Sequence, residues 1–126
     1  MPTTPYHEIL DLPLGGWSLD EAQEAAIAEH LTLVKTISLR DEPYEFDDVR
    51  LYVRKADGAI LYARDSGCSC PSPFEYAKVV DLKETTLAGL EALFTEYASD
   101  SYGRSLAAVL KDVRDARPAL VAAGAK

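Results

Sequence analysis

Two alternating segments joined by a tight turn limit what this chain can fold into more than any other feature of its sequence. Residues 46–55 place apolar side chains at every second position, at Val49, Leu51 and Val53. This two-residue period predicts a strand with one buried face. The pair Asp57-Gly58 supplies the residues that a tight hairpin turn requires, and residues 59–64 are expected to return beside the first segment. We therefore expect an antiparallel sheet built around this hairpin.

A further strand is predicted immediately before the hairpin. Residues 31–40 alternate between polar and apolar side chains, and the apolar ones are Leu31, Leu33, Ile37 and Leu39. This period, together with the β-branched residues, indicates a strand. Val79 and Val80 suggest a short edge strand within residues 76–82. An antiparallel meander of three or four strands is the simplest topology.

Helices are predicted on both sides of the sheet segments in the sequence. Ser18 and Glu21 have the spacing of a capping box, so we expect a helix from about residue 19 to residue 29 or 30, with alanines that allow close approach to a neighbouring element. Apolar residues at helical spacing within residues 85–117 predict two more helices. Pro118 is expected to end or kink the last one.

The organisation that follows is a single α+β domain over residues 1–126, in which the meander packs against N-terminal and C-terminal helices. Its parts are an N-terminal arm (1–17), the β-meander (31–64), a cysteine loop (65–75) and the C-terminal helices (85–117). A chain of 126 residues buries roughly two-thirds of its unfolded surface, so it needs no disulfide scaffold. We find neither a signal peptide nor a membrane-spanning run and expect a cytoplasmic protein with no membrane partner.

The negative charge is concentrated in the first part of the chain. Residues 1–48 hold eleven acidic and two basic residues, a net charge of −9, whereas the remaining residues carry a net charge of +1. Binding to nucleic acid requires basic residues that displace counterions from phosphates. The distribution therefore argues against a nucleic-acid partner and favours a basic protein partner.

An acidic cluster stands out within this part: Asp41, Glu42, Glu45, Asp47 and Asp48. In an extended segment Glu45 and Asp47 lie on one side about 6.6 Å apart, near the spacing of successive phosphates along DNA. An acidic DNA-mimic inhibitor is therefore one interpretation, and a solvated loop with ordinary surface acids is the simpler one. The residue spacing of a calcium-binding loop is absent.

The most unusual stretch of the sequence is the cysteine loop, for which we expect a binding role. Its candidate binding residues are Asp65, Ser66, Gly67, Cys68, Ser69, Cys70, Pro71, Ser72, Pro73 and Phe74. Glycine and the prolines indicate a stiff loop, and a stiff loop loses little entropy when it binds a partner. The same stiffness would equally serve to anchor Phe74 in the core.

The two thiols of this loop allow other interpretations. Cys68 and Cys70 on one face could bind zinc with His30 or His7, with Asp65 in reserve or with a second chain supplying the missing ligands, although no third cysteine is present. A disulfide between them would be strained, because disulfides favour Cα atoms about 5.5 Å apart. Gly67 to Pro71 resembles a nucleophile elbow only superficially, since the second glycine is missing and prolines prevent the helix that should follow. We expect no cofactor, with zinc as the alternative.

Part of the chain carries a resemblance to known sequences. The run from Tyr44 through the hairpin into the string Asp65-Ser66-Gly67-Cys68-Ser69-Cys70-Pro71-Ser72-Pro73-Phe74-Glu75 resembles a family of short uncharacterised proteins from actinobacteria and the phages that infect them. The resemblance covers about residues 44–82. It implies a hairpin that leads into the cysteine loop and a phage or prophage origin, and it implies no activity.

These observations favour a small non-enzymatic protein that binds or modulates a host protein through the cysteine loop or the acidic cluster, with no catalytic residues. A zinc- or thiol-dependent protein and a DNA mimic are the alternatives. A protein partner is expected, and a homodimer is compatible with the sequence.

Overall fold

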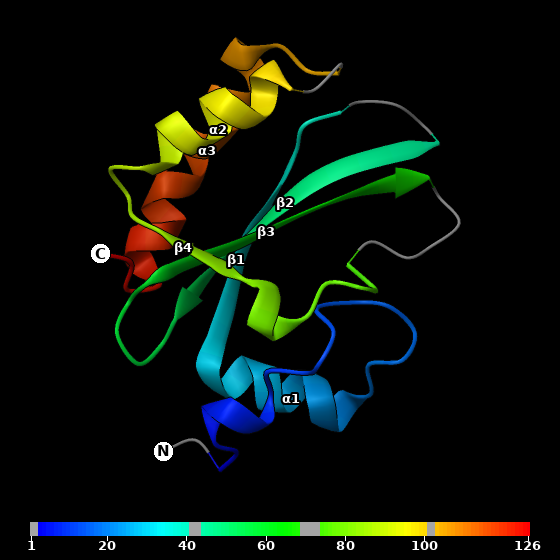
Figure 1. The fold of residues 1–126 in the computed structure, drawn as a ribbon. Helices are drawn as coiled ribbons and strands as arrows, with labels where there is room; N and C mark the ends of the chain where they lie inside the picture. Colours follow the sequence, from blue (N-terminus) through cyan, green and yellow to red (C-terminus); the bar gives the residue numbers. More distant parts are fainter. Residues whose placement is uncertain (1–2, 41–43, 69–73, 101–102) are drawn as a thin grey trace.

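An antiparallel four-stranded sheet forms the middle of the protein (Figure 1). The computed structural model describes residues 3–40, 44–68, 74–100 and 103–126. The strands follow the order β1-β2-β3-β4, so every neighbour in the sheet is also a neighbour in sequence, as the predicted meander requires. Their bounds are β1 Leu31–Ser38, β2 Glu45–Arg54, β3 Ile60–Cys68 and β4 Lys83–Thr85.

Helices from both ends of the chain pack on this sheet, as predicted, and the structure places them on opposite faces. In Figure 1, α2 and α3 lie on one side, whereas α1 and the N-terminal arm lie on the other. The helices are α1 Glu21–His30, α2 Leu90–Ser99 and α3 Leu106–Ala122, and two 3₁₀ turns are η1 Tyr6–Glu8 and η2 Val79–Asp81. In the part of the chain that the structure describes, no helix combines the length and the apolar character needed to cross a membrane.

The alternation in β2 divides the core into two clusters. Val49, Leu51 and Val53 pack with Phe94 and other residues of α2 and α3, on what we call the helix face. Tyr52 packs with the arm and α1 on what we call the arm face. The predicted hairpin is confirmed by the antiparallel pairing of β2 with β3. Its connection is longer than the predicted tight turn, since the Arg54 N–H donates to the Ala59 carbonyl oxygen at 2.9 Å and the Gly58 N–H donates to the Arg54 carbonyl oxygen at 2.8 Å.

A β-bulge changes the face to which β1 contributes. Simple alternation would place the apolar residues of the predicted strand on one face, namely Leu31, Leu33, Ile37 and Leu39. The pairing of β1 with β2 instead shifts register between Leu33 and Lys35. Leu31 consequently packs on the arm face, whereas Ile37 packs on the helix face. An extra residue in one strand reverses the side to which later side chains point.

Residues 76–82 do not form the predicted edge strand. The Val79 and Val80 N–H groups donate to the Leu12 and Leu10 carbonyl oxygens of the arm, each at 3.0 Å, and η2 forms there. The edge of the sheet is β4 instead, which pairs with the first residues of β3. The arm therefore takes the hydrogen bonds that a neighbouring strand would have taken.

Two helix boundaries also differ from the predictions. The capping box of α1 uses Asp20 and Gln23, so the helix begins two residues later than expected. Pro118 lies inside α3, which continues to Ala122. Leu120, in the turn after the proline, is fully buried in the helix-face core, and this packing stabilises the last turn despite the missing N–H.

Candidate functional site

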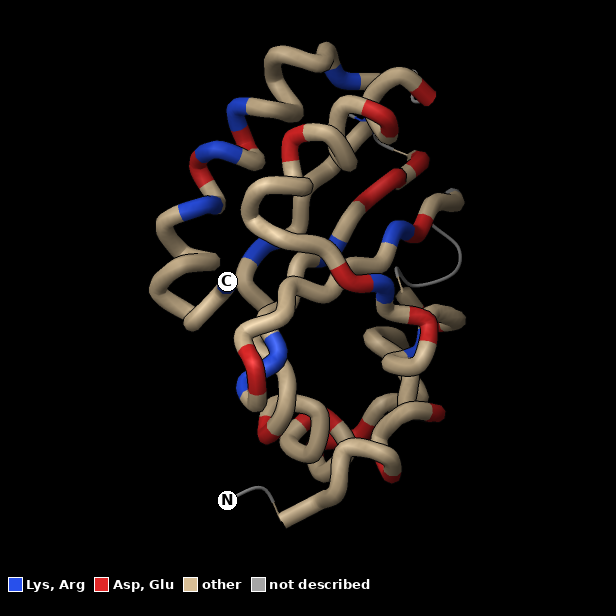
Figure 2. Tube along the Cα trace, turned by 60° about the vertical axis from the view of Figure 1, so that its left-hand side comes forward, with Lys and Arg blue, Asp and Glu red and all other residues tan. Residues whose placement is uncertain are grey.

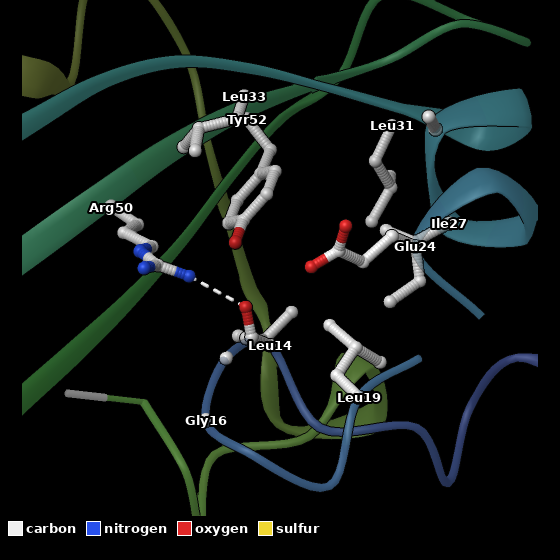
Figure 3. A pocket seen from close by; sticks show the side chains of 11 residues that line it. Leu14, Gly16, Leu19, Glu24, Ile27, Leu31, Leu33, Arg50 and Tyr52 are labelled. Atoms are coloured by element: carbon white, nitrogen blue, oxygen red, sulfur yellow. Dashed lines mark hydrogen bonds between the residues drawn. The ribbon is translucent and has the colours of Figure 1, made fainter. Parts of the chain in front are cut away.

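The arm, α1 and the sheet enclose a pocket of about 420 Å³, which we call the arm pocket (Figure 3). This volume lies within the range typical of ligand sites. Its lining combines apolar and polar groups, with somewhat more apolar surface, and the apolar side chains are Leu14, Leu19, Ile27, Ala28, Leu31 and Leu33. The arm pocket therefore offers a cavity of the right size for a bulky apolar group.

The composition of α1 explains why this side of the sheet is incompletely filled. Four of the ten residues of α1 are alanines, and Ile27 is the only residue of the helix that is buried. Three of these alanines are exposed and the fourth is half-buried, so Ile27 is the one large side chain that α1 buries against the sheet. Ile27 is therefore the main contact of α1 with the arm face, and Ala28 lines the pocket next to Ile27.

The arm forms the opposite wall, held by the segment that follows the cysteine loop. The Leu14 N–H donates to the Ala77 carbonyl oxygen at 2.7 Å. Gly16 has φ +96°, and a Cβ at this position would lie 2.8 Å from Glu75 Cγ and 3.2 Å from Glu75 Cα. Glycine is required here both for its backbone angle and for the close approach of the two segments. These contacts fix the arm wall of the pocket in place.

Arg50 and Tyr52 bring polar groups from β2 to the pocket. Arg50 Nη1 donates to the Leu14 carbonyl oxygen at 2.6 Å, and its Cζ lies 4.3 Å from the centroid of the Phe74 ring. Arg50 Nε is buried and has no hydrogen-bond partner among the described residues. Burial raises the pKa of Tyr52, and a hydrogen bond from Arg50 opposes that rise. The Tyr52 hydroxyl therefore stays protonated near neutral pH.

Glu24 from α1 completes the polar groups of the pocket. Figure 3 shows its carboxylate directed into the space that the Tyr52 hydroxyl also faces. The structure forms no ion pair between Glu24 and any residue that it describes. The pocket thus combines apolar walls with one cation and one unpaired carboxylate.

One exposed apolar residue lines the pocket, and another follows a lining residue in the sequence. Leu33 lines it and is 49% exposed, and Trp17, which follows Gly16, is 92% exposed. No local sequence pattern marks this pocket or its residues. The alternation of β2 puts Arg50 and Tyr52 on one face, but only the tertiary structure brings the arm and α1 to them.

The structure describes the cysteine loop only in part. Asp65, Ser66, Gly67 and the Cys68 backbone belong to β3, and residues 69–73, together with the side chain of Cys68, lie outside the described structure. Phe74 is fully buried with φ +64°, and its N–H donates to Asp65 Oδ2 at 2.7 Å. The anchoring of Phe74 in the core, one of the two roles considered for the stiff loop, is confirmed. Arg50, which lines the arm pocket, lies over the Phe74 ring.

His30 cannot complete a metal site with Cys68. Leu31, next to His30, pairs with Arg54 at one end of β2, whereas Cys68 pairs with Glu45 at the other end. Nine residues of extended strand separate these positions by about 30 Å. His30 Nε2 instead lies within hydrogen-bonding distance of the Thr4 carbonyl oxygen. In residues 3–40, 44–68, 74–100 and 103–126, no group of three His, Cys, Asp or Glu side chains is arranged to bind a metal ion.

The part of the acidic cluster that the structure describes does not form the surface strip that the DNA-mimic interpretation requires. Asp47 is 5% exposed, and its carboxylate accepts hydrogen bonds from Arg64 Nε at 2.9 Å and Nη2 at 2.7 Å. Glu45 is paired with Arg40. Asp48 is half-buried, and Asp41 and Glu42 lie outside the described residues. Because Asp47 is buried and neutralised by Arg64, it cannot present the charge that a DNA mimic needs.

Comparison with known proteins places this chain in a family without an assigned activity. The family model described as a domain of unknown function (DUF7574) matches residues 23–122. The chain therefore belongs to this family, and the matched range includes most of α1, the whole sheet and both C-terminal helices. No curated protein and no solved structure matches the chain.

Proposed function

We propose that this member of the uncharacterised family is a non-enzymatic protein-binding domain, and that the arm pocket accepts an apolar side chain of its partner. The observation that carries the proposal is the open 420 Å³ cavity with leucine and isoleucine walls. Burying a leucine-sized side chain contributes about 2 kcal/mol. One such anchor surrounded by weaker contacts is a common arrangement in protein recognition.

The mouth of the pocket favours a protein over a small molecule. Leu33 lines the pocket yet is 49% exposed, and Trp17, which follows the lining residue Gly16, is 92% exposed, so apolar surface extends beyond what a compact ligand would cover. A partner segment that enters the pocket would cover both residues. Tryptophan is among the residues that contribute most strongly to protein interfaces. This proposal keeps the protein-binding role that the sequence predicts and assigns it to the arm pocket in place of the cysteine loop. A phage or host setting stays a prediction.

A random peptide library selected on the purified protein tests this proposal. We expect enriched peptides that contain a bulky apolar residue, and their binding should change the fluorescence of Trp17, the single tryptophan of the chain. Leu33→Asp should weaken binding at least tenfold, because it places a charge at the apolar mouth.

Val121→Asp is the matched control. Val121 is 53% exposed, close to the 49% of Leu33, but it lies on α3 beyond the helix face of the sheet. This variant should bind the selected peptides as the wild type does. A library that yields no saturable binder, or binders equally sensitive to both substitutions, would contradict the proposal.

A further inference from the structure

We infer that the partner segment is basic as well as apolar, and that Glu24 at the mouth of the arm pocket selects it by pairing with a lysine or arginine next to the apolar anchor. This inference rests on the proposed function. It adds a charge preference to the pocket, which can fail while apolar binding persists.

The charges around the pocket carry the inference. Before Lys35 the chain contains six acidic residues and no lysine or arginine: Glu8, Asp11, Asp20, Glu21, Glu24 and Glu29. Figure 2 shows mostly acidic residues at the end of the molecule where the arm and α1 lie, with some basic residues among them. One of these is Lys55, whose Nζ donates to the Ala28 carbonyl oxygen at 2.6 Å. Glu75, packed against Gly16, adds another carboxylate beside the arm wall. A basic segment would therefore be attracted to this end of the molecule.

Glu24 differs from the other carboxylates of this end in its position. Asp20 caps α1 through the Gln23 N–H at 2.8 Å, and Glu29 accepts hydrogen bonds from Thr3 Oγ1 and the Thr4 N–H. Glu24 has no such contact in the described part of the chain, and its carboxylate is directed into the pocket (Figure 3). It is therefore placed to accept a hydrogen bond from a bound cation.

Arg50 is the opposing charge on the pocket wall. Its Nη1 is occupied by the Leu14 carbonyl oxygen, its guanidinium lies over Phe74, and its Nε is buried. These contacts hold Arg50 against the inner wall, whereas Glu24 is an exposed residue of α1. Arg50 is thus engaged by its neighbours, whereas the Glu24 carboxylate has no ion-pair partner among the described residues, so the pocket favours a cation over an anion.

A second copy of this chain is a poor occupant for the same reason. The net charge is −8, and a copy docked through the same surface would bring like charges together around the pocket. Like charges placed opposite each other at an interface oppose association. A partner that differs in sequence and carries positive charge avoids this repulsion.

Three matched peptides test the inference. Each has twelve residues with leucine at the same positions, and the remaining positions are lysine, glutamine or glutamate. Titration followed by Trp17 fluorescence and calorimetry should rank lysine above glutamine above glutamate. Glu24→Gln should weaken the lysine peptide about threefold and leave the glutamine peptide unchanged. Glu96→Gln, at an exposed residue of α2, should change neither.

The outcomes separate the charge preference from the proposed function. Equal affinity for the lysine and glutamine peptides, with both weakened by Leu33→Asp, would overturn the inference and support the apolar pocket. A preference for the glutamate peptide would mean that Arg50, and not Glu24, determines which peptide charge the pocket prefers. This result would also overturn the inference. If no peptide binds, or if sedimentation shows a dimer that Leu33→Asp dissociates, the basic partner is rejected together with the proposed pocket use.

Discussion

The two faces of the sheet are covered in different ways, and only one of them encloses the arm pocket. On the helix face, α2 and α3 contribute large buried side chains such as Leu90, Phe94 and Leu120. On the arm face, α1 contributes a single buried side chain, and irregular segments supply the rest of the cover. A helix that buries one large side chain leaves volume beside a sheet, whereas a helix that buries leucine and phenylalanine fills it.

On both faces arginine side chains lie against aromatic rings, with different partners. On the helix face, Arg64 Cζ lies 4.7 Å from the Tyr97 ring centroid, and the carboxylate of Asp47 neutralises the charge. On the arm face, Arg50 lies over Phe74 and donates to a backbone carbonyl oxygen. On the helix face, the charge of Arg64 is therefore neutralised by a carboxylate of the same face. On the arm face, Arg50 and Glu24 lie beside an open cavity.

The largest expected effect compares core deletions on the two faces. Phe94→Ala should lower the free energy of unfolding by about 4 kcal/mol, because Phe94 is fully buried. Leu31→Ala, beside the arm pocket, should cost about 2 kcal/mol, since fewer neighbours surround this side chain. Urea unfolding measures both values. Equal losses would mean that the arm face is packed as densely as the helix face.

The buried ion pair of the helix face gives the next prediction. Asp47→Asn should lower the free energy of unfolding by about 3 kcal/mol, because it leaves Arg64 without its carboxylate. Glu45→Gln is the control in the same strand, where a more exposed pair should contribute less than about 0.5 kcal/mol. Thermal unfolding of both variants checks the difference. A loss of similar size in the two would indicate that burial of Asp47 has no energetic consequence.

A smaller effect is expected where the C-terminal residues meet the hairpin. Gly58 has φ +74°, and a Cβ there would lie 2.3 Å from the Gly124 carbonyl oxygen. Gly58→Ala should cost about 2 kcal/mol from backbone strain and displacement of the last residues. Gly124→Ala shares a positive φ but meets no atom within 4 Å, so it should cost less. Neither should alter peptide binding at the arm pocket, which lies on the other face.

The smallest effect is a pH dependence at the hairpin. Arg54 lowers the pKa of Asp57 from 3.8 to about 2 by a hydrogen bond, and the Ala59 N–H adds to the shift. Because this pKa is depressed in the folded state, the stabilisation is complete above about pH 4 and is lost as the pH falls towards 2. Asp57→Asn should flatten the stability profile within this window. An unchanged acid limb in urea titrations would contradict the assignment.

Local sequence pattern was sufficient for most of the elements. The period of two in β2, the Asp57-Gly58 turn and the helical spacing of the C-terminal residues all involve neighbours within a few positions. Interactions with distant segments caused the differences. Residues 79–81 bond to the arm, and burial of Leu120 maintains α3 beyond Pro118.

By itself the sequence determined an α+β meander with helices before and after it and an acidic N-terminal part, because hydrophobic period and charge are properties of the chain read in order. Only the tertiary structure decided that Leu31 and Ile37 face opposite ways, that Asp47 is buried by Arg64, and that a pocket exists. The pocket walls come from residues 14–19, 24–33 and 50–52, three segments with no shared local signal. A cavity is the volume that packed segments fail to fill, so it is defined only once the segments are in place.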